Sequence, residues 1–262
     1  MWNETEKKPI VHFLLLTFSI AWITEGTIIL GERLGIITNS MAWVGITTAL
    51  IGFGAGMAPT YAIIILLKKH GKIRGFKDFC GRVFKAKNAF KTVIGIVVFC
   101  CIPIIWNIIG NTYIGNWYLA ILTIPIMVFG GGMEEIGWRG FLQPALEEKM
   151  PFIAAAFAVG IIWAVWHLPL WLIQNANQSS FNIGAFFLFC IGNSFVFAAL
   201  HKFTKSVFAC IFIHAFSNAL GSAFTFDILA DTPNIKVIIT VTLSIILSII
   251  VWAIVNRKEK VT

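Results

Sequence analysis

Residues 60–106 read TYAIIILLKKHGKIRGFKDFCGRVFKAKNAFKTVIGIVVFCCIPIIW, two apolar runs joined by a basic loop. The loop carries nine basic residues and one acid, a net charge of +8, which equals the formal net charge of the whole chain. Such a loop is typical of the cytoplasmic side of a membrane protein, where it faces anionic lipid. The nine basic residues are Lys68, Lys69, Lys72, Arg74, Lys77, Arg82, Lys85, Lys87 and Lys91.

The composition of the whole chain agrees with this interpretation. Of its 262 residues, 58% are hydrophobic and only 12% are charged. A soluble domain of this size needs a larger charged shell, so the composition excludes an ordinary soluble protein and a disordered chain. No nucleic-acid-binding motif accompanies the basic loop, and we therefore expect the lipid bilayer to be its partner and not a nucleic acid.

Eight apolar segments approach or exceed the length of about 20 residues that a membrane-spanning helix needs. The second and fourth are too long for a straight crossing, and we expect them to tilt, break or run along the interface. The predicted fold is an all-α polytopic membrane protein, with residues 1–262 in one integral membrane domain. The segments are Ile10–Leu30, Met41–Leu67, Thr92–Ile109, Trp117–Leu146, Phe152–Ile173, Ile183–Leu200, Ser206–Phe226 and Lys236–Asn256.

The distribution of basic residues predicts the orientation. With a cytoplasmic N-terminus, the inner segments carry 17 of the 20 Lys and Arg residues, and the outer segments carry Arg33 and Lys236. Basic residues concentrate in cytoplasmic loops, so both termini are predicted to be inside. We expect a prokaryotic plasma membrane location, with the basic loop 68–91 in the cytoplasm.

Ionisable side chains within the apolar segments are costly and are therefore functional candidates. Glu134 and Glu135 open the pattern EEIGWR, which ends at Arg139. Glu135 and Arg139 are four residues apart, so they share a helical face and can pair. Glu134 lies about 100° round the helix and can point elsewhere, as a general base or acid would. The alternative is a structural ion-pair network.

Two further patterns place histidines in apolar segments. Trp163 and His167 share a face in the fifth segment, and His214 and Asn218 do so in the seventh. The second pair could donate two hydrogen bonds to one point, as an oxyanion site requires. Hydrogen-bonded packing between helices is the alternative for both patterns.

Counting from the predicted cytoplasmic boundaries puts these groups at one depth. Glu135, His167, His214 and Asn218 lie at depths of roughly 12 to 22 Å. We expect them to share a catalytic cavity that water enters from the cytoplasm or through a lateral gap. Glu25 has no patterned partner, and it could face this cavity or lie near the outer edge.

Together the three patterns resemble the CPBP family, the CAAX protease and bacteriocin-processing intramembrane proteases also called Abi. That family has E-E-x-x-x-R, then F-x-x-x-H, then H-x-x-x-N or H-x-x-x-D on separate helices. Here the order is EEIGWR from Glu134, WAVWH to His167 and HAFSN from His214, within a catalytic core of roughly residues 117–226. The departure is Trp163, where the family usually has Phe.

The resemblance implies a role for each residue. Glu134 would be the general base that activates water, and His167 would help to hold that water. His214 and Asn218 would stabilise the oxyanion, while Glu135 and Arg139 would support the geometry. If a metal such as zinc were present, Glu134, His167 and His214 would be its ligands, but no H-E-x-x-H occurs and a glutamate–histidine mechanism needs no metal.

The predicted activity is hydrolysis of a peptide bond in a membrane-associated substrate. The resemblance implies a prenylated CAAX-type protein or a bacteriocin or peptide precursor as that substrate. One alternative is a non-catalytic bacteriocin-immunity or scaffold protein of the same fold. The other is a small proton-coupled transporter with Glu134 and Glu135 as its relay.

Overall fold

The computed structural model describes residues 9–85, 87–230 and 235–261, with side chains as far as Arg257. All regular elements in these ranges are helices. The basic residues Lys7, Lys8, Lys258 and Lys260, which count toward the predicted orientation, lie outside the described side chains. The all-α fold predicted from the sequence is confirmed.

The helices follow one another with short connections. Those of the first half are α1 (Ile10–Arg33), α2 (Met41–Ala49), η1 (Leu50–Gly56), α3 (Ala58–Lys69), α4 (Phe76–Val83), α5 (Ala89–Gly110) and α6 (Trp117–Phe129). Around the EEIGWR pattern lie η2 (Gly132–Glu134), α7 (Glu135–Gly137), η3 (Trp138–Leu142) and α8 (Gln143–Glu147). The rest are α9 (Phe152–Trp166), η4 (Leu168–Leu172), η5 (Asn177–Ser180), α10 (Ile183–Thr204), α11 (Val207–Ala219), η6 (Leu220–Ser222), α12 (Asp227–Ala230) and α13 (Ile235–Val261).

Six helical stretches in the described ranges are long and apolar enough to cross a membrane. A seventh span arises if α6 and the helices from Gly132 to Glu147, which meet at an angle of 42°, are one broken crossing. The remaining predicted segment contains a shorter apolar helix, Val207–Ser222. The count of eight spans and the orientation of the termini stay predictions.

Both segments that were too long for a straight crossing are interrupted. The second contains the π-helix η1, in which Gly52, Gly54 and Gly56 alternate with larger residues. The fourth breaks after α6, where Gly131 has a φ of 141°, a backbone conformation that favours glycine. Such interruptions often mark functional sites, because they leave backbone groups and side chains directed away from the helix axis.

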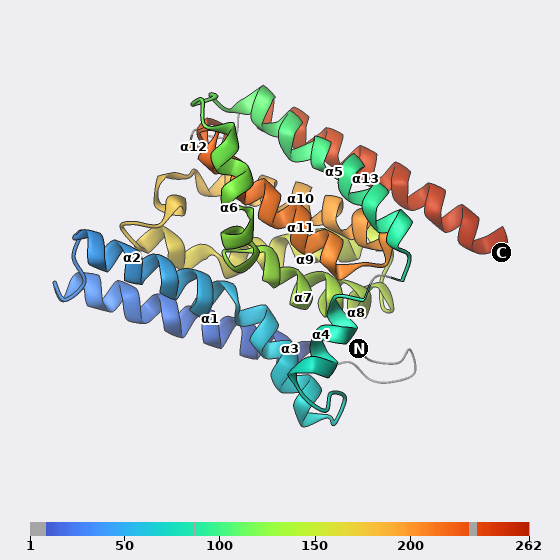
Figure 1. Cartoon of the computed structure of the whole chain (residues 1–262), viewed down its shortest axis with the longest axis horizontal. Helices are drawn as coiled ribbons and strands as arrows, with labels where there is room; N and C mark the ends of the chain where they lie inside the picture. Colours follow the sequence, from blue (N-terminus) through green and yellow to red (C-terminus); the bar gives the residue numbers. More distant parts are fainter. Residues whose placement is uncertain (1–8, 86, 231–234, 262) are drawn as a thin grey trace.

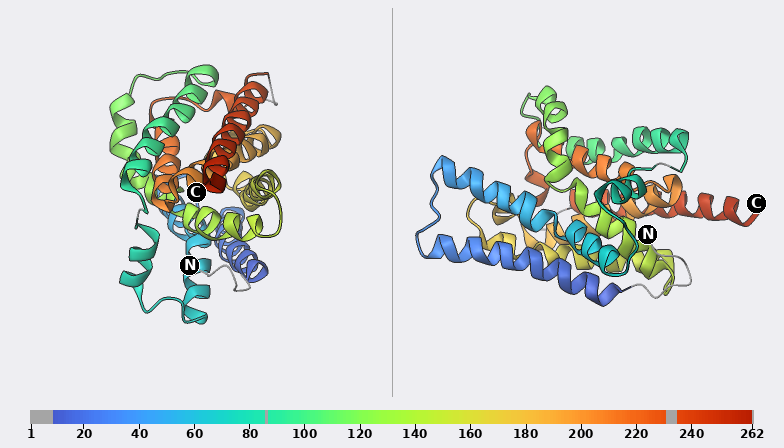
Figure 2. Two further views of the ribbon diagram at one scale, coloured as in Figure 1. Left: turned by 90° about the vertical axis from the view of Figure 1, so that its right-hand side faces the viewer. Right: turned by 60° about the horizontal axis from the view of Figure 1, so that its bottom comes forward.

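The helices run mainly along the long axis of the molecule (Figure 1). The basic loop with α4 and the C-terminal end of α13 lie toward one end, and the α1–α2 turn and α12 lie toward the other (Figures 1 and 2). In the basic loop, a hydrogen bond from Arg82 to Asp78 holds the pKa of that partly exposed carboxyl below its ordinary value. The long helix α10 contacts α9, α11, α13 and α5 and is the most deeply buried candidate span.

The contact between α9 and α10 depends on a small residue. A Cβ atom on Gly160 would lie 2.8 Å from the Cα atom of Ile191 and 3.4 Å from the carbonyl oxygen of Cys190. One helical turn away, Ser194 Oγ donates a hydrogen bond of 2.8 Å to the carbonyl oxygen of Ala156. Close approach at a glycine and an interhelical hydrogen bond are the forces that hold helices together in lipid.

We predict that Gly160→Ala destabilises the protein by about 1–3 kcal/mol, because the added methyl forces the two backbones apart. Gly26→Ala on α1 is the matched control, since no atom lies within 4 Å of a Cβ there. Thermal unfolding in detergent measures the difference. Equal unfolding midpoints for the two variants would contradict the proposed role of this close contact.

Candidate active site

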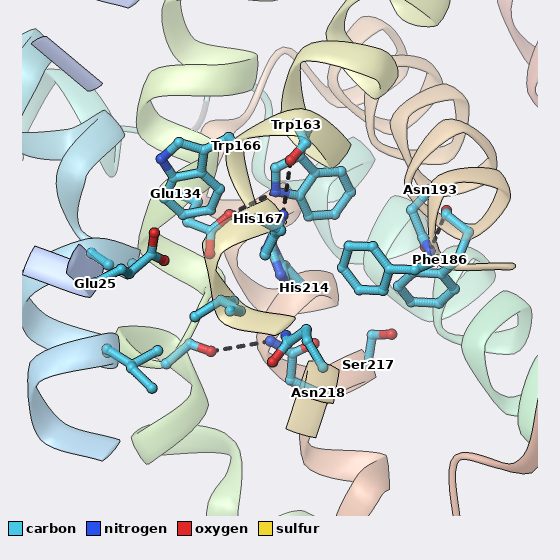
Figure 3. Close-up of a pocket in the computed structure, with 18 of the residues that line it drawn as sticks. Glu25, Glu134, Trp163, Trp166, His167, Phe186, Asn193, His214, Ser217 and Asn218 are labelled. Carbon is cyan, nitrogen blue, oxygen red and sulfur yellow. Dashed lines mark hydrogen bonds between the residues drawn. The ribbon is translucent and has the colours of Figure 1, made fainter. Parts of the chain in front are cut away.

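A cavity of about 130 Å³ lies inside the helical bundle (Figure 3). Its polar lining comes from helices that are far apart in the sequence, and its apolar walls are mainly aromatic rings. The polar side chains are Glu25, Glu134, His167, Gln178, Asn193, His214, Ser217 and Asn218. The aromatic ones are Trp163, Trp166, Phe186, Phe189 and Phe197. By volume the cavity holds about four water molecules.

The turn that presents Glu134 is wedged between α3 and α11. Thr60 Oγ1 donates a hydrogen bond of 2.6 Å to the carbonyl oxygen of Met133. On the other side, a Cβ atom on Gly132 would lie 2.8 Å from the carbonyl oxygen of Ile211. Because Gly132 has no side chain, α11 approaches the turn closely, while the hydrogen bond from Thr60 holds α3 on the other side. These two contacts fix the position of the backbone of Glu134.

Glu134 points into the cavity and is held there by two indoles (Figure 3). Trp163 Nε1 donates to Glu134 Oε2 at 2.8 Å, and Trp138 Nε1 donates to the same oxygen at 3.3 Å. An indole N–H can only donate, so it suits an ionised carboxylate. None of the described residues donates to Oε1, which is the oxygen left for a ligand or water.

Glu135 turns the opposite way and forms a buried network. Its Oε1 atom accepts from Arg139 Nη1 at 3.0 Å and from His214 Nδ1 at 2.9 Å. The guanidinium also lies over two aromatic rings. Its Cζ atom is 5.2 Å from the centroid of the Trp163 ring and 4.9 Å from the centroid of the Phe197 ring. The predicted Glu135–Arg139 pair and the divergence of Glu134 are confirmed, whereas the bond to His214 was not predicted from the sequence.

Both histidines use Nδ1 to hold the ring and leave Nε2 free. His214 Nδ1 faces the carboxylate of Glu135, and His167 Nδ1 lies 2.8 Å from the carbonyl oxygen of Trp163. A carboxylate and a carbonyl can only accept, so each Nδ1 carries a proton. Each ring therefore has Nε2 available to the cavity that it lines.

Asn218 and His214 line one small space beside Gly131. A Cβ atom on Gly131 would lie 2.5 Å from Asn218 Nδ2 and 3.0 Å from His214 Nε2. Asn218 Nδ2 also donates to the carbonyl oxygen of Gly130 at 3.1 Å, which orients the amide. Both nitrogens therefore lie close together against the Gly131 backbone, where a side chain at position 131 would collide with them. Whether they donate to one substrate oxygen stays a prediction.

The residues do not fit a preformed zinc site. Among the described residues, no three His, Cys, Asp or Glu side chains are grouped as metal ligands. Glu134, His167 and His214 were the ligands expected if a metal were present. These three side chains do not form such a group, and the proposed reaction uses the side chains alone.

Glu25, which has no patterned partner in the sequence, lines the same cavity from α1. Trp138 and Trp163 were also underestimated from the sequence, because their indole N–H groups hold Glu134 and do not merely pack. The signal for Glu25 is an acid in an otherwise apolar helix. For the tryptophans, the signal is their spacing. Trp138 lies one helical turn after Glu134, and Trp163 lies one helical turn before His167.

The cavity extends from the middle of the bundle toward the end opposite the basic loop. Gln178 lies in η5, which follows Gln174 and Asn175, and these donate to Glu32 and Asn39 at the α1–α2 turn. Phe186 lies one turn into α10, and Asn182, just before that helix, donates to Leu229 of α12. The α1–α2 turn and α12 both lie toward this end (Figure 1). If both termini are cytoplasmic, as predicted, this end faces outward. The predicted orientation would then conflict with an opening toward the cytoplasm and leave the lateral gap as the expected entrance.

Three known proteins or families are similar to this chain. Residues 115–220 match the family described as type II CAAX prenyl endopeptidase Rce1-like, a range that includes every motif residue from Glu134 to Asn218. CAAX prenyl protease 2 of Methanococcus maripaludis is 26% identical over 216 residues, 74% of this chain and 78% of that protein. Lysostaphin resistance protein A of Staphylococcus haemolyticus is 24% identical over 249 residues, 85% of this chain and 65% of that protein.

We predict that Arg139→Leu destabilises the protein by about 3–5 kcal/mol, because it removes the guanidinium partner of the buried Glu135. Thermal unfolding in detergent provides the measurement. Arg82→Leu removes an exposed pair with Asp78 and is the matched control, for which we expect little change. Similar losses of stability in both variants would show that burial of the Glu135 network does not determine its contribution to stability.

Proposed function

Because the chain belongs to the CPBP/Rce1-like family, we propose that it is an intramembrane endopeptidase that uses water activated by Glu134. The observation that supports this most strongly is the convergence of Glu134, His167, His214 and Asn218 on one cavity. A base, a second water-binding group and two donors for a developing charge are the parts that hydrolysis of a peptide bond requires.

The first step is attack of water on the carbonyl carbon of the substrate. The water lies between Glu134 Oε1 and His167 Nε2, which both lack described protein partners. Glu134 takes one proton as the C–O bond forms, and the neutral imidazole of His167 accepts the other hydrogen bond of the water. Trp163 and Trp138 keep the carboxylate directed at the water.

The negative oxygen of the tetrahedral intermediate lies in the cavity that Asn218 and His214 line. Asn218 Nδ2 and His214 Nε2 donate to it, as their positions close to each other allow. His214 must be doubly protonated to do so, because its Nδ1 proton already faces Glu135. Before the reaction, the ionised Glu134 and Glu135 balance Arg139 and the protonated His214. In the intermediate, the oxyanion carries the negative charge in place of the protonated Glu134.

The second step breaks the C–N bond. The proton that Glu134 took from water moves to the leaving nitrogen, the carbonyl re-forms, and the products are a carboxylic acid and an amine. Glu134 is then ionised again, and the reaction consumes only water and the peptide.

The position of the cavity bears on the substrate. If the basic loop is cytoplasmic, the cavity is reached from outside or laterally from the bilayer. That favours a secreted or membrane-anchored peptide precursor over a prenylated protein in the cytoplasm. A membrane-associated peptide or lipidated protein remains the proposed substrate class.

A non-catalytic role is the second candidate, because the staphylococcal relative is named for lysostaphin resistance. A scaffold or immunity protein would keep its biological effect without Glu134, His167 and His214. No described contact specifically favours a proton-coupled transporter, which stays an untested alternative.

We predict that Glu134→Gln lowers kcat by about 10²- to 10⁴-fold, since the amide cannot take a proton from water. The measurement is mass-spectrometric detection of cleavage of farnesylated and unmodified peptides by the purified protein. Glu147→Gln, on α8 outside the cavity lining, is the control and should retain activity. A Glu134→Gln variant with full activity would exclude this mechanism.

We predict that Gly131→Ala lowers kcat by about 10²- to 10³-fold, because its methyl group would displace the two proposed oxyanion donors, Asn218 Nδ2 and His214 Nε2, and alanine is strained at a φ of 141°. Gly130→Ala is the neighbouring control, since the contacts of a Cβ there begin at 3.4 Å and its φ is negative. Unfolding midpoints of the two variants separate a loss of activity from a loss of fold. Equal activities would contradict the assigned oxyanion position.

We predict that the cavity mouth faces away from the cytoplasm. In a cysteine-free background, Gln178→Cys should react with an impermeant maleimide applied to intact cells. A variant that retains only Cys80, in the basic loop, should react only after the membrane is opened. The reverse pattern would invert the predicted orientation and restore a cytoplasmic opening.

A further inference from the structure

Glu25 is a second carboxyl group in the cavity that the reaction above does not use. Its side chain is 2% exposed, and its Oε2 atom is sealed from solvent with no hydrogen-bond partner among the described residues. It reaches the cavity from α1, on the wall across from Phe186 and Asn193 (Figure 3). Glu134 on the same cavity has two indole donors, whereas none of the described residues donates to Glu25.

Glu25 is not needed to hold α1 in place. Its neighbours do so, because Trp22 Nε1 donates to the carbonyl oxygen of Trp166 and Thr24 packs closely against Gly54 of η1. A buried carboxyl group without a donor opposes folding. Binding of a ligand by Glu25 would compensate for this cost and would account for its place on the cavity wall.

The charges around the cavity indicate what Glu25 would bind. Two carboxyl groups, Glu25 and Glu134, line the cavity, and none of its described lining residues is Lys or Arg. Of the two nearby cations, Arg139 is committed to Glu135 and to the faces of two aromatic rings. The protonated His214 also faces Glu135 through Nδ1. A positively charged ligand group would therefore find an acceptor that no described protein donor occupies, in surroundings less polar than bulk water.

We propose that Glu25 forms a substrate-binding subsite for a basic side chain, Lys or Arg, near the peptide bond that is cleaved. The inference rests on the proposed endopeptidase activity and adds to it a preference among peptides. Glu25 acts by binding and not by proton transfer, because Glu134 both takes the proton of the water and returns it to the leaving nitrogen. The hydrolysis is balanced without Glu25.

The test compares matched peptides that carry Lys or Gln at each position flanking the cleaved bond. For the wild-type protein we expect kcat/KM to be at least about tenfold higher with Lys at one position, and Glu25→Gln should abolish this preference. Activity toward the Gln peptide should change by less than about threefold. Glu32→Gln, on the same helix but outside the cavity lining, is the matched control and should keep the preference.

Any one of three results would overturn the proposed subsite. The first is no preference for a basic residue in the wild-type protein. The second is equal slowing of both peptides by Glu25→Gln, and the third is loss of the preference in Glu32→Gln as well. Glu25→Asp keeps the charge and should retain part of the preference, so it replaces Glu25→Gln in the test if the amide variant does not fold.

A binding experiment separates this inference from the proposed activity. Fluorescent Lys and Gln peptides are titrated into Glu134→Gln and into the double variant with Glu25→Gln. Preferential binding of the Lys peptide that is lost in the double variant supports the subsite, even if the wild-type protein cleaves neither peptide. Equal binding of both peptides to Glu134→Gln overturns it.

Discussion

The carboxylate of Glu135 is the contact on which the site depends. One of its oxygens accepts from Arg139 and from His214, and all three side chains are buried. Single charges in such surroundings would be strongly unfavourable, but together they compensate one another. The aromatic faces of Trp163 and Phe197 add a further favourable contact to the guanidinium. The network ties α7 and η3 to α11 and brings His214 beside Glu134.

The broken helix between α6 and α7 makes this arrangement compatible with catalysis. An uninterrupted helix would carry Glu134 past the cavity, and a side chain at position 131 would collide with His214 and Asn218. The interruption thus presents the base and leaves the two proposed oxyanion donors in place. Aromatic walls around it limit water, so each hydrogen bond to a developing charge is stronger than it would be in solvent.

Much of this was predictable from the sequence, because i and i+4 spacing fixes which residues share a helical face. The Glu135–Arg139 pair and the shared face of His214 and Asn218 follow from this rule. The interruption of both long apolar segments was one of three expectations drawn from their length, beside tilting and running along the interface. The bond from His214 to Glu135 joins residues 79 positions apart, and no spacing rule indicates it. The position of Glu25 on the cavity wall and the indole hydrogen bonds to Glu134 could not be predicted from the sequence either. They depend on how α1 and α9 pack against the broken helix. The direction in which the cavity extends also required the fold.

Labelled water tests the central claim most directly. The purified protein is incubated with a cleavable membrane peptide in H₂¹⁸O, and products and protein are analysed by mass spectrometry during the first turnover. The account predicts one ¹⁸O atom in the new carboxyl terminus of the peptide and no covalent peptide adduct on the protein. Absence of product from folded protein, or an acyl adduct on Glu134, would contradict it.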